Sequence, residues 1–121
     1  MKYKKLWTDM HSNIHHEQME ELPLWYSQIK KTMDFWPLAY YPFYMRPTEW
    51  GLKVEDWYED QLTNADWEQI REFTEKVNKE GYPMFMGYEW QGAGLDGDHN
   101  VFFLNNDGEQ RHPMRYQELA A

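Results

Sequence analysis

Residues 63–80 carry the clearest secondary-structure pattern in the chain, and short apolar runs lie on both sides of them. Four large apolar residues recur there at helical spacing: Trp67, Ile70, Phe73 and Val77. Thr63 or Asn64 can cap the start of this helix, and Gly81 supplies a left-handed stop after its end. A helix that joins two apolar runs favours an α/β arrangement over a β-sandwich.

The other segments continue this alternation. Strands are expected over four apolar runs: Tyr3–Thr8, Met33–Tyr41, Met84–Trp90 and Asn100–Leu104. A helix is expected within Glu17–Thr32, where Pro23 either interrupts it or starts a fresh helix, and a third helix can begin at Pro113. Residues 42–62 hold two prolines, a glycine and five aromatic residues, which predicts an ordered surface excursion. No repeat or linker divides the chain, so residues 1–121 are expected to form one domain.

Charge and composition narrow the classes of partner. The chain has 12 Lys and Arg against 21 Asp and Glu, a formal charge of −9, which argues against a protein that tracks nucleic-acid phosphates. At 41% hydrophobic and 18% aromatic residues it is too apolar for a disordered acidic tail. Without cysteine it has neither disulfides nor a thiolate zinc site, so a metal would be held by histidine and carboxylate.

No apolar run approaches the ~20 residues of a membrane span, so no membrane partner is expected. The basic start at residues 1–5 is not followed by the apolar stretch of a signal peptide. A cytoplasmic location is expected for the chain as given, and a secreted or periplasmic one if a signal peptide precedes it.

The aromatic residues divide into two expected groups. One group is expected in the core rather than on a carbohydrate platform: Trp7, Trp25, Trp36, Trp67 and Phe73. The other lies in the excursion among four carboxylates, and consists of Trp50, Trp57 and Tyr58. These three residues either cover a site or bind a sugar face, or they simply pin their own loop.

Histidine and carboxylate residues gather near the expected strand ends. His11, His15 and His16 follow the first expected strand, and His99 precedes the last one. Asp9, His11 and Glu89 are expected at carboxyl ends of strands, where sites form in parallel α/β folds. Such ligands suit zinc, manganese or iron, which generate hydroxide near neutral pH. The alternative is that they are solvated loop residues.

Three stretches resemble motifs of the polymerase and histidinol phosphatase (PHP) superfamily. Residues 8–13, Thr-Asp-Met-His-Ser-Asn, resemble its Asp-Leu-His-x-His-Ser/Thr motif after strand one. Residues 33–41 are similar to its Leu-Asp-Phe-x-Ala-Leu-Thr-Asp-His segment. Residues 87–90, Gly-Tyr-Glu-Trp, followed by residues 97–103, resemble a PHP-like branch in which Gly-Tyr-Glu-Trp precedes His-x-Asn-Val. Order and spacing agree over about residues 6–104.

The resemblance implies a distorted barrel of seven β/α units that binds two or three metal ions and hydrolyses phosphoesters. Carried over position by position, it implies the metal ligands His11, Glu89 and His99. Four further residues are weaker ligand candidates: Asp9, Asn13, His15 and His16.

The metal motifs are partly degenerate. Asn13 stands where the first motif has a second histidine, and Tyr40 and Tyr41 stand where the second motif has Asp and His. The family's last ligands, an Asp-x-His, would follow Ala121, and a closed α/β barrel takes about 250 residues. The chain is therefore expected to be the N-terminal portion of a PHP-like barrel.

These observations lead to one expected function and two alternatives. The first is a fragment of a metal-dependent hydrolase of phosphoesterase ancestry, with an eroded site that holds Zn, Mn or Fe at low occupancy. The second is a catalytically silent binding or scaffold domain that contacts a partner or a glycan. The third is a piece of a longer protein or of a homo-oligomer that supplies the missing strands. The substrate, whether a small molecule or a glycan, stays open.

Overall fold

The computed structural model describes residues 2–91 and 97–105, with Val54 and Glu55 described in their backbone only. Its strands are β1 (Ser12–His15), β2 (Trp36–Tyr41), β3 (Phe43–Pro47), β4 (Lys53–Trp57), β5 (Met84–Phe85), β6 (Gly87–Gln91) and β7 (Asp98–Phe102). Its helices are a 3-10 helix η1 (His16–Glu21), α1 (Leu22–Thr32) and α2 (Asp60–Lys79). The expected helix at residues 113–121 lies outside the described residues.

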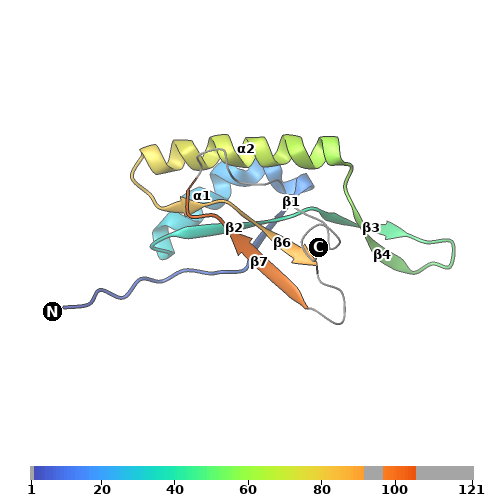
Figure 1. The fold of residues 1–121 in the computed structure, drawn as a ribbon, viewed down its shortest axis with the longest axis horizontal. Helices are drawn as coiled ribbons and strands as arrows, with labels where there is room; N and C mark the ends of the chain where they lie inside the picture. The colour runs from blue at the N-terminus through green and yellow to red at the C-terminus, as the bar shows by residue number, and fades with distance from the viewer. Residues whose placement is uncertain (1, 92–96, 106–121) are drawn as a thin grey trace.

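The main sheet has the order β1-β2-β6-β7 (Figure 1). β1, β2 and β6 are parallel, and β7 runs antiparallel to β6. β5 pairs with β2 just before β6 does, so the strand expected over Met84–Trp90 forms in two pieces. β3 and β4 form a separate antiparallel hairpin. The expected α/β class is confirmed, and among the described residues β1 and β7 are open edges and no barrel closes.

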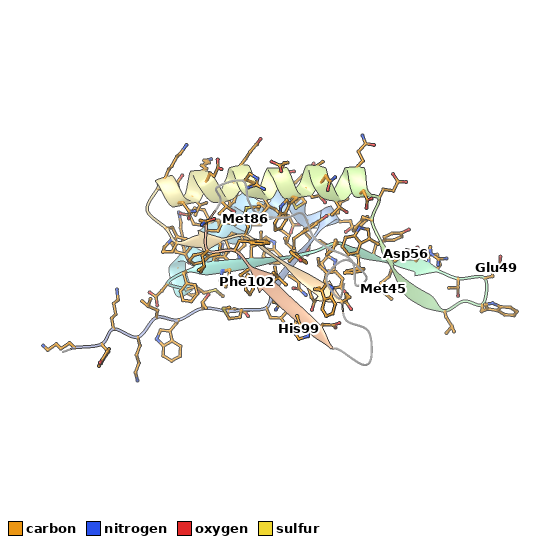
Figure 2. All side chains as sticks on the ribbon, viewed as in Figure 1. Met45, Glu49, Asp56, Met86, His99 and Phe102 are labelled. Atoms are coloured by element: carbon orange, nitrogen blue, oxygen red, sulfur yellow. The ribbon has the colours of Figure 1, made fainter. Side chains whose placement is uncertain are left out.

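Helices α1 and α2 cover the same face of the main sheet. The register places Ile14, Tyr40 and Tyr88 at one level of three neighbouring strands, and all three side chains are fully buried. They belong to a single core cluster with Leu22 of α1 and Trp67 of α2. Figure 2 shows Met86, another member of this cluster, on the side of the sheet that faces α2. The opposite face of the sheet therefore carries no helix among the described residues.

Helix α2 confirms most of the expected pattern and begins earlier than expected. The Thr63 N–H already bonds to the Glu59 carbonyl at 3.0 Å, so the residue expected to cap the helix lies inside its first turn. Gly81 has φ +95°, which confirms the left-handed stop. Pro23 stands in the first turn of α1, where proline costs no hydrogen bond, so the fresh-helix alternative is the one that forms.

The first strand was expected over Tyr3–Thr8, and this prediction is wrong. Tyr3 and Trp7 are 88% and 69% exposed, so the apolar character of the segment does not bury it, and Trp7 is not a core residue. The Trp7 N–H donates to Asp34 Oδ2 at 2.7 Å, and the Asp34 N–H donates to the Trp7 carbonyl at 2.8 Å. These two hydrogen bonds attach the segment to the residues just before β2. Strand pairing starts only at Ser12, where alternate residues of β1 are buried.

The other expected core aromatics behave as predicted. Trp36 and Trp67 are fully buried, and Trp25 and Phe73 pack partly buried against the core cluster. None of the helices in the described residues has both the length and the apolar character needed to cross a membrane.

The excursion expected at residues 42–62 is an ordered hairpin followed by the start of α2. The hairpin extends away from the main sheet, with Glu49 near its tip (Figure 2). Trp57 pins it through a perpendicular ring contact to Phe43, with centroids 4.9 Å apart. Trp50 is 87% exposed at the tip. Because β3 follows β2 after a single residue, the hairpin begins at the carboxyl end of the parallel strands.

Candidate functional site

A cavity of about 580 Å³ lies on the helix-free face, at the carboxyl ends of the parallel strands. Its volume falls within the range of ligand pockets in proteins. The strands contribute Asn13, His15, Tyr41, Glu89 and Gln91 to it, and the hairpin contributes Phe43, Tyr44 and Met45. Three further residues complete the described lining: Glu17, Tyr58 and Asp98.

Strand alternation explains why these polar residues face the cavity. In β6, Tyr88 and Trp90 are buried in the core cluster, so Glu89 and Gln91 point to the opposite face. In β1, Ile14 is buried in the same core, and Asn13 is directed toward the cavity. One face of each strand therefore builds the core while the other builds the cavity.

The structure brings His11, Asn13 and Glu89 together beside this cavity. His11 Nε2 lies 3.4 Å from Glu89 Oε1. Asn13 Nδ2 lies 3.2 Å from His11 Nε2 and donates to Glu89 Oε2 at 3.3 Å. The imidazole is well exposed, whereas the Glu89 side chain is only 8% exposed. We call these three residues the His11–Asn13–Glu89 cluster.

The position of Glu89 changes its acidity. Burial raises the pKa of Glu89 above its ordinary value, while nearby His11 lowers it and the charge of Asp98 raises it further. Gln91 Nε2 donates to Glu89 Oε2 at 3.4 Å and to the Tyr41 hydroxyl at 3.1 Å. The carboxylate is thus held by donors from two strands and aimed at the cavity.

His99 is not part of this cluster. In the antiparallel pair β6–β7, His99 lies opposite Trp90, and their ring centroids are 5.4 Å apart. Asn100 is the residue opposite Glu89, and its Nδ2 donates to the Met10 carbonyl at 2.9 Å. Directly opposed residues share a face, so His99 and Glu89 lie on different faces of the sheet. His99 and Phe102 lie toward opposite ends of β7 (Figure 2).

The weaker ligand candidates have separate surroundings. Asp9 Oδ1 accepts the His11 backbone N–H at 2.8 Å, so both residues lie before β1 and not at the carboxyl strand end that the sequence suggested. His15 lines the cavity and contacts the Tyr41 ring, with centroids 4.6 Å apart. In the part of the chain that the structure describes, no three His, Asp or Glu side chains are grouped closely enough to hold a metal ion by themselves.

His16 belongs to a different, buried polar network. Its Nδ1 lies 2.8 Å from Asp66 Oδ2, and the Tyr40 hydroxyl donates to the same oxygen at 2.6 Å. Burial, with the neighbouring Asp66, raises the pKa of Tyr40 far above its ordinary value. Tyr40 thus points into the core, and of the two tyrosines in the second resembling motif Tyr41 is the one that lines the cavity.

Sequence reasoning missed several residues of the cavity and of this network. Gln91 and Asp98 were not among the expected site residues, although they pair with each other at the carboxyl edge of the sheet. Asp66 was not among them either, and it is buried in α2. Its position one residue before Trp67, on the buried side of α2, is a signal that was available in the sequence.

Comparison of the chain with protein-family models, with curated proteins and with solved structures finds no significant match.

Proposed function

We propose that this chain forms the N-terminal part of a PHP-like metal-dependent hydrolase, in which the His11–Asn13–Glu89 cluster holds a divalent ion at the cavity. The observation that carries this proposal is the 3.4 Å approach of His11 Nε2 to Glu89 Oε1 beside a ligand-sized cavity. An imidazole and a carboxylate converging in this way form a donor pair that suits Zn, Mn or Fe.

The amide of Asn13 supports the fit of an ion. Its Nδ2 lies 3.2 Å from His11 Nε2 and donates to Glu89 Oε2, and its Oδ1 is buried with no hydrogen-bond partner among the described residues. If an ion displaced these hydrogen bonds, rotation of the Asn13 amide would allow its oxygen to serve as a third ligand with His11 and Glu89.

The chemistry follows from the donor set. His11, Asn13 and Glu89 would hold a divalent ion, which when bound would supply an activated water for hydrolysis. Gln91 orients Glu89 through its 3.4 Å hydrogen bond, which keeps the carboxylate aimed at the ion. The hairpin residues Phe43 and Tyr44 contribute aromatic side chains to the lining of the cavity.

Calorimetric titration with Mn²⁺ and Zn²⁺ tests the proposal. Wild type is expected to bind one ion, His11→Ala and Glu89→Gln are expected to weaken binding by about tenfold or more, and Asn13→His is expected to strengthen it. His99→Ala is the matched control, because His99 lies on the other face of the sheet. Equal affinities in wild type and His11→Ala would overturn the proposal.

A silent binding domain is the second candidate. The observation that favours it is the small number of strong ligands, since His11 and Glu89 are the only His and carboxylate pair in the cluster. This candidate expects no stoichiometric metal and no turnover. Phosphoesterase activity with added Mn²⁺ that disappears in His11→Ala would exclude it, and inactivity together with an absence of bound metal would favour it.

A further inference from the structure

We propose that the cavity binds an organic ammonium group, with carboxylates holding the positive charge and aromatic side chains holding the attached carbon skeleton. This inference goes beyond the proposed function and does not depend on a metal ion. It rests on the charges and the aromatic rings of the residues that line the cavity at the carboxyl ends of β1, β2 and β6.

The charged residues that line the cavity are all acidic among the described Asp, Glu, Lys and Arg side chains. Three carboxylates line the cavity, Glu17, Glu89 and Asp98, and none of the described lining residues is Lys or Arg. The nearest arginine on the hairpin, Arg46, is not among them and pairs with Asp56 at 2.8 Å. In the absence of a metal ion, a phosphate or carboxylate ligand would meet three carboxylates and no Lys or Arg among the described lining residues, whereas a cation is attracted.

The three carboxylates come from three different elements. Glu89 comes from the sheet, Glu17 from η1 and Asp98 from the start of β7. Glu17 accepts a hydrogen bond from the Tyr58 hydroxyl, which lowers the pKa of Glu17 and keeps it ionised. A group with several N–H donors can therefore bond to acceptors from more than one element at once.

Aromatic rings also line the cavity. The rings of Tyr41 and Phe43 meet edge to face with centroids 5.2 Å apart and planes at 60°, and the rings of Tyr44 and Tyr58 lie 5.0 Å apart in a tilted contact. All four residues line the cavity. Ring faces attract cations through the ring quadrupole, and they also bury apolar carbon. An organic ammonium ion fits this lining, because its charge pairs with the carboxylates and its carbon skeleton packs against the rings. A neutral polyol would leave the carboxylates without a counter-charge.

A matched pair of probes tests the inference on the whole chain in the presence of EDTA. 2-Phenylethylammonium and 2-phenylethanol have the same skeleton, and they differ in the charged group. The ammonium compound is expected to bind at least about tenfold more tightly by calorimetry, and added salt is expected to weaken it. Because EDTA removes divalent ions, failure of this experiment is separate from failure of the metal site.

Two charge-removing variants locate the binding. Asp98→Asn is expected to weaken the ammonium probe several-fold and leave the alcohol unchanged, whereas Glu75→Gln on the exposed side of α2 is expected to change neither. The inference is overturned if neither probe binds, if both bind equally, or if Asp98→Asn and Glu75→Gln behave alike. It is also overturned if a methyl glucoside binds and the ammonium probe does not.

Discussion

The carboxylate of Asp66 is 4% exposed in the core, where it accepts a hydrogen bond from the Tyr40 hydroxyl and lies 2.8 Å from His16 Nδ1. A buried carboxylate is stable only with such partners, because an unpaired charge in the core is costly. The network therefore ties η1, β2 and α2 together at a point next to the cavity residue Tyr58, whose ring contacts His16.

Asp66→Asn is expected to reduce the free energy of unfolding by about 2 kcal/mol, because two charge-assisted hydrogen bonds lose their acceptor charge. Urea denaturation measures the change. Glu68→Gln on the same helix is the control, since the Glu68 side chain is exposed and its ion pair with Arg71 is expected to contribute a few tenths of a kcal/mol, about the value of an exposed helix pair. Equal losses in the two variants would show that the buried network contributes nothing special.

Glu89 is expected to lower stability at neutral pH. Its raised pKa means that the folded chain holds the proton more tightly than the unfolded chain, whose carboxyl titrates near 4.5. Stability from this group is therefore full below that value and is lost as the pH rises through the folded pKa. Glu89→Gln is expected to be more stable than wild type at neutral pH, with the gain shrinking at about pH 4.

Urea midpoints at the two pH values measure this difference, with Glu75→Gln as an exposed control. A gain of the same size at both pH values would contradict the expected titration of Glu89. A loss at neutral pH would mean that the hydrogen bonds from Asn13 and Gln91 stabilise the carboxylate by more than its burial destabilises it.

At the scale of elements, the close approach of β6 and β7 requires a residue without a side chain at position 87, which is Gly87. A Cβ built there would lie 2.3 Å from Phe102 Cδ1 and 2.6 Å from the Val101 carbonyl oxygen. The second contact is with backbone, so a side-chain rotation cannot relieve it. Glycine at this position lets the two strands that carry Glu89 and Asp98 approach each other.

Gly87→Ala is expected to cost about 2–3 kcal/mol of unfolding free energy, because the strands must separate. Chemical denaturation measures the loss. The double variant Gly87→Ala/Phe102→Ala removes the ring contact and keeps the carbonyl contact, so it is not expected to restore wild-type stability. A Gly87→Ala protein as stable as wild type would contradict the close approach of the two strands.

The elements differ in how well the sequence predicts them. Helix α2 is predictable because its apolar spacing and the stop at Gly81 agree with each other. The first strand is not predictable, because Tyr3 and Trp7 look like a strand and yet are exposed, while Ile14 is the one apolar residue among the four of β1. Asn13 and His15 of this strand face the cavity. Because these site residues are polar, the strand lacks the apolar run by which it could be recognised in the sequence.

The hairpin at residues 43–57 was missed as a pair of strands for a related reason. Its β3 side chains are half-buried or exposed, which gives no strong apolar alternation. Prediction of the site was also partial. His11 and Glu89 were placed together by their motifs, whereas the face of His99 depends on the register of β7, which one residue can reverse.

At the scale of the whole molecule, net charge determines one outcome. With a formal charge of −9, the chain is expected not to bind duplex DNA at physiological salt, because no excess of Lys and Arg displaces counterions from the phosphates. Fluorescence anisotropy of a labelled duplex measures this. A micromolar complex that weakens steeply with added salt would contradict the expectation.

Strand β6 has a double role that limits how its length can vary. Tyr88 and Trp90 belong to the core, and Glu89 and Gln91 belong to the cavity. Inserting or deleting one residue within β6 would exchange these two sets, and would place a carboxylate against the helices and an aromatic ring in the cavity. The hairpin tip around Glu49 projects away from the sheet and has no such constraint (Figure 2). Natural variants of this chain are therefore expected to gain or lose residues at the tip and to keep the length of β6 fixed.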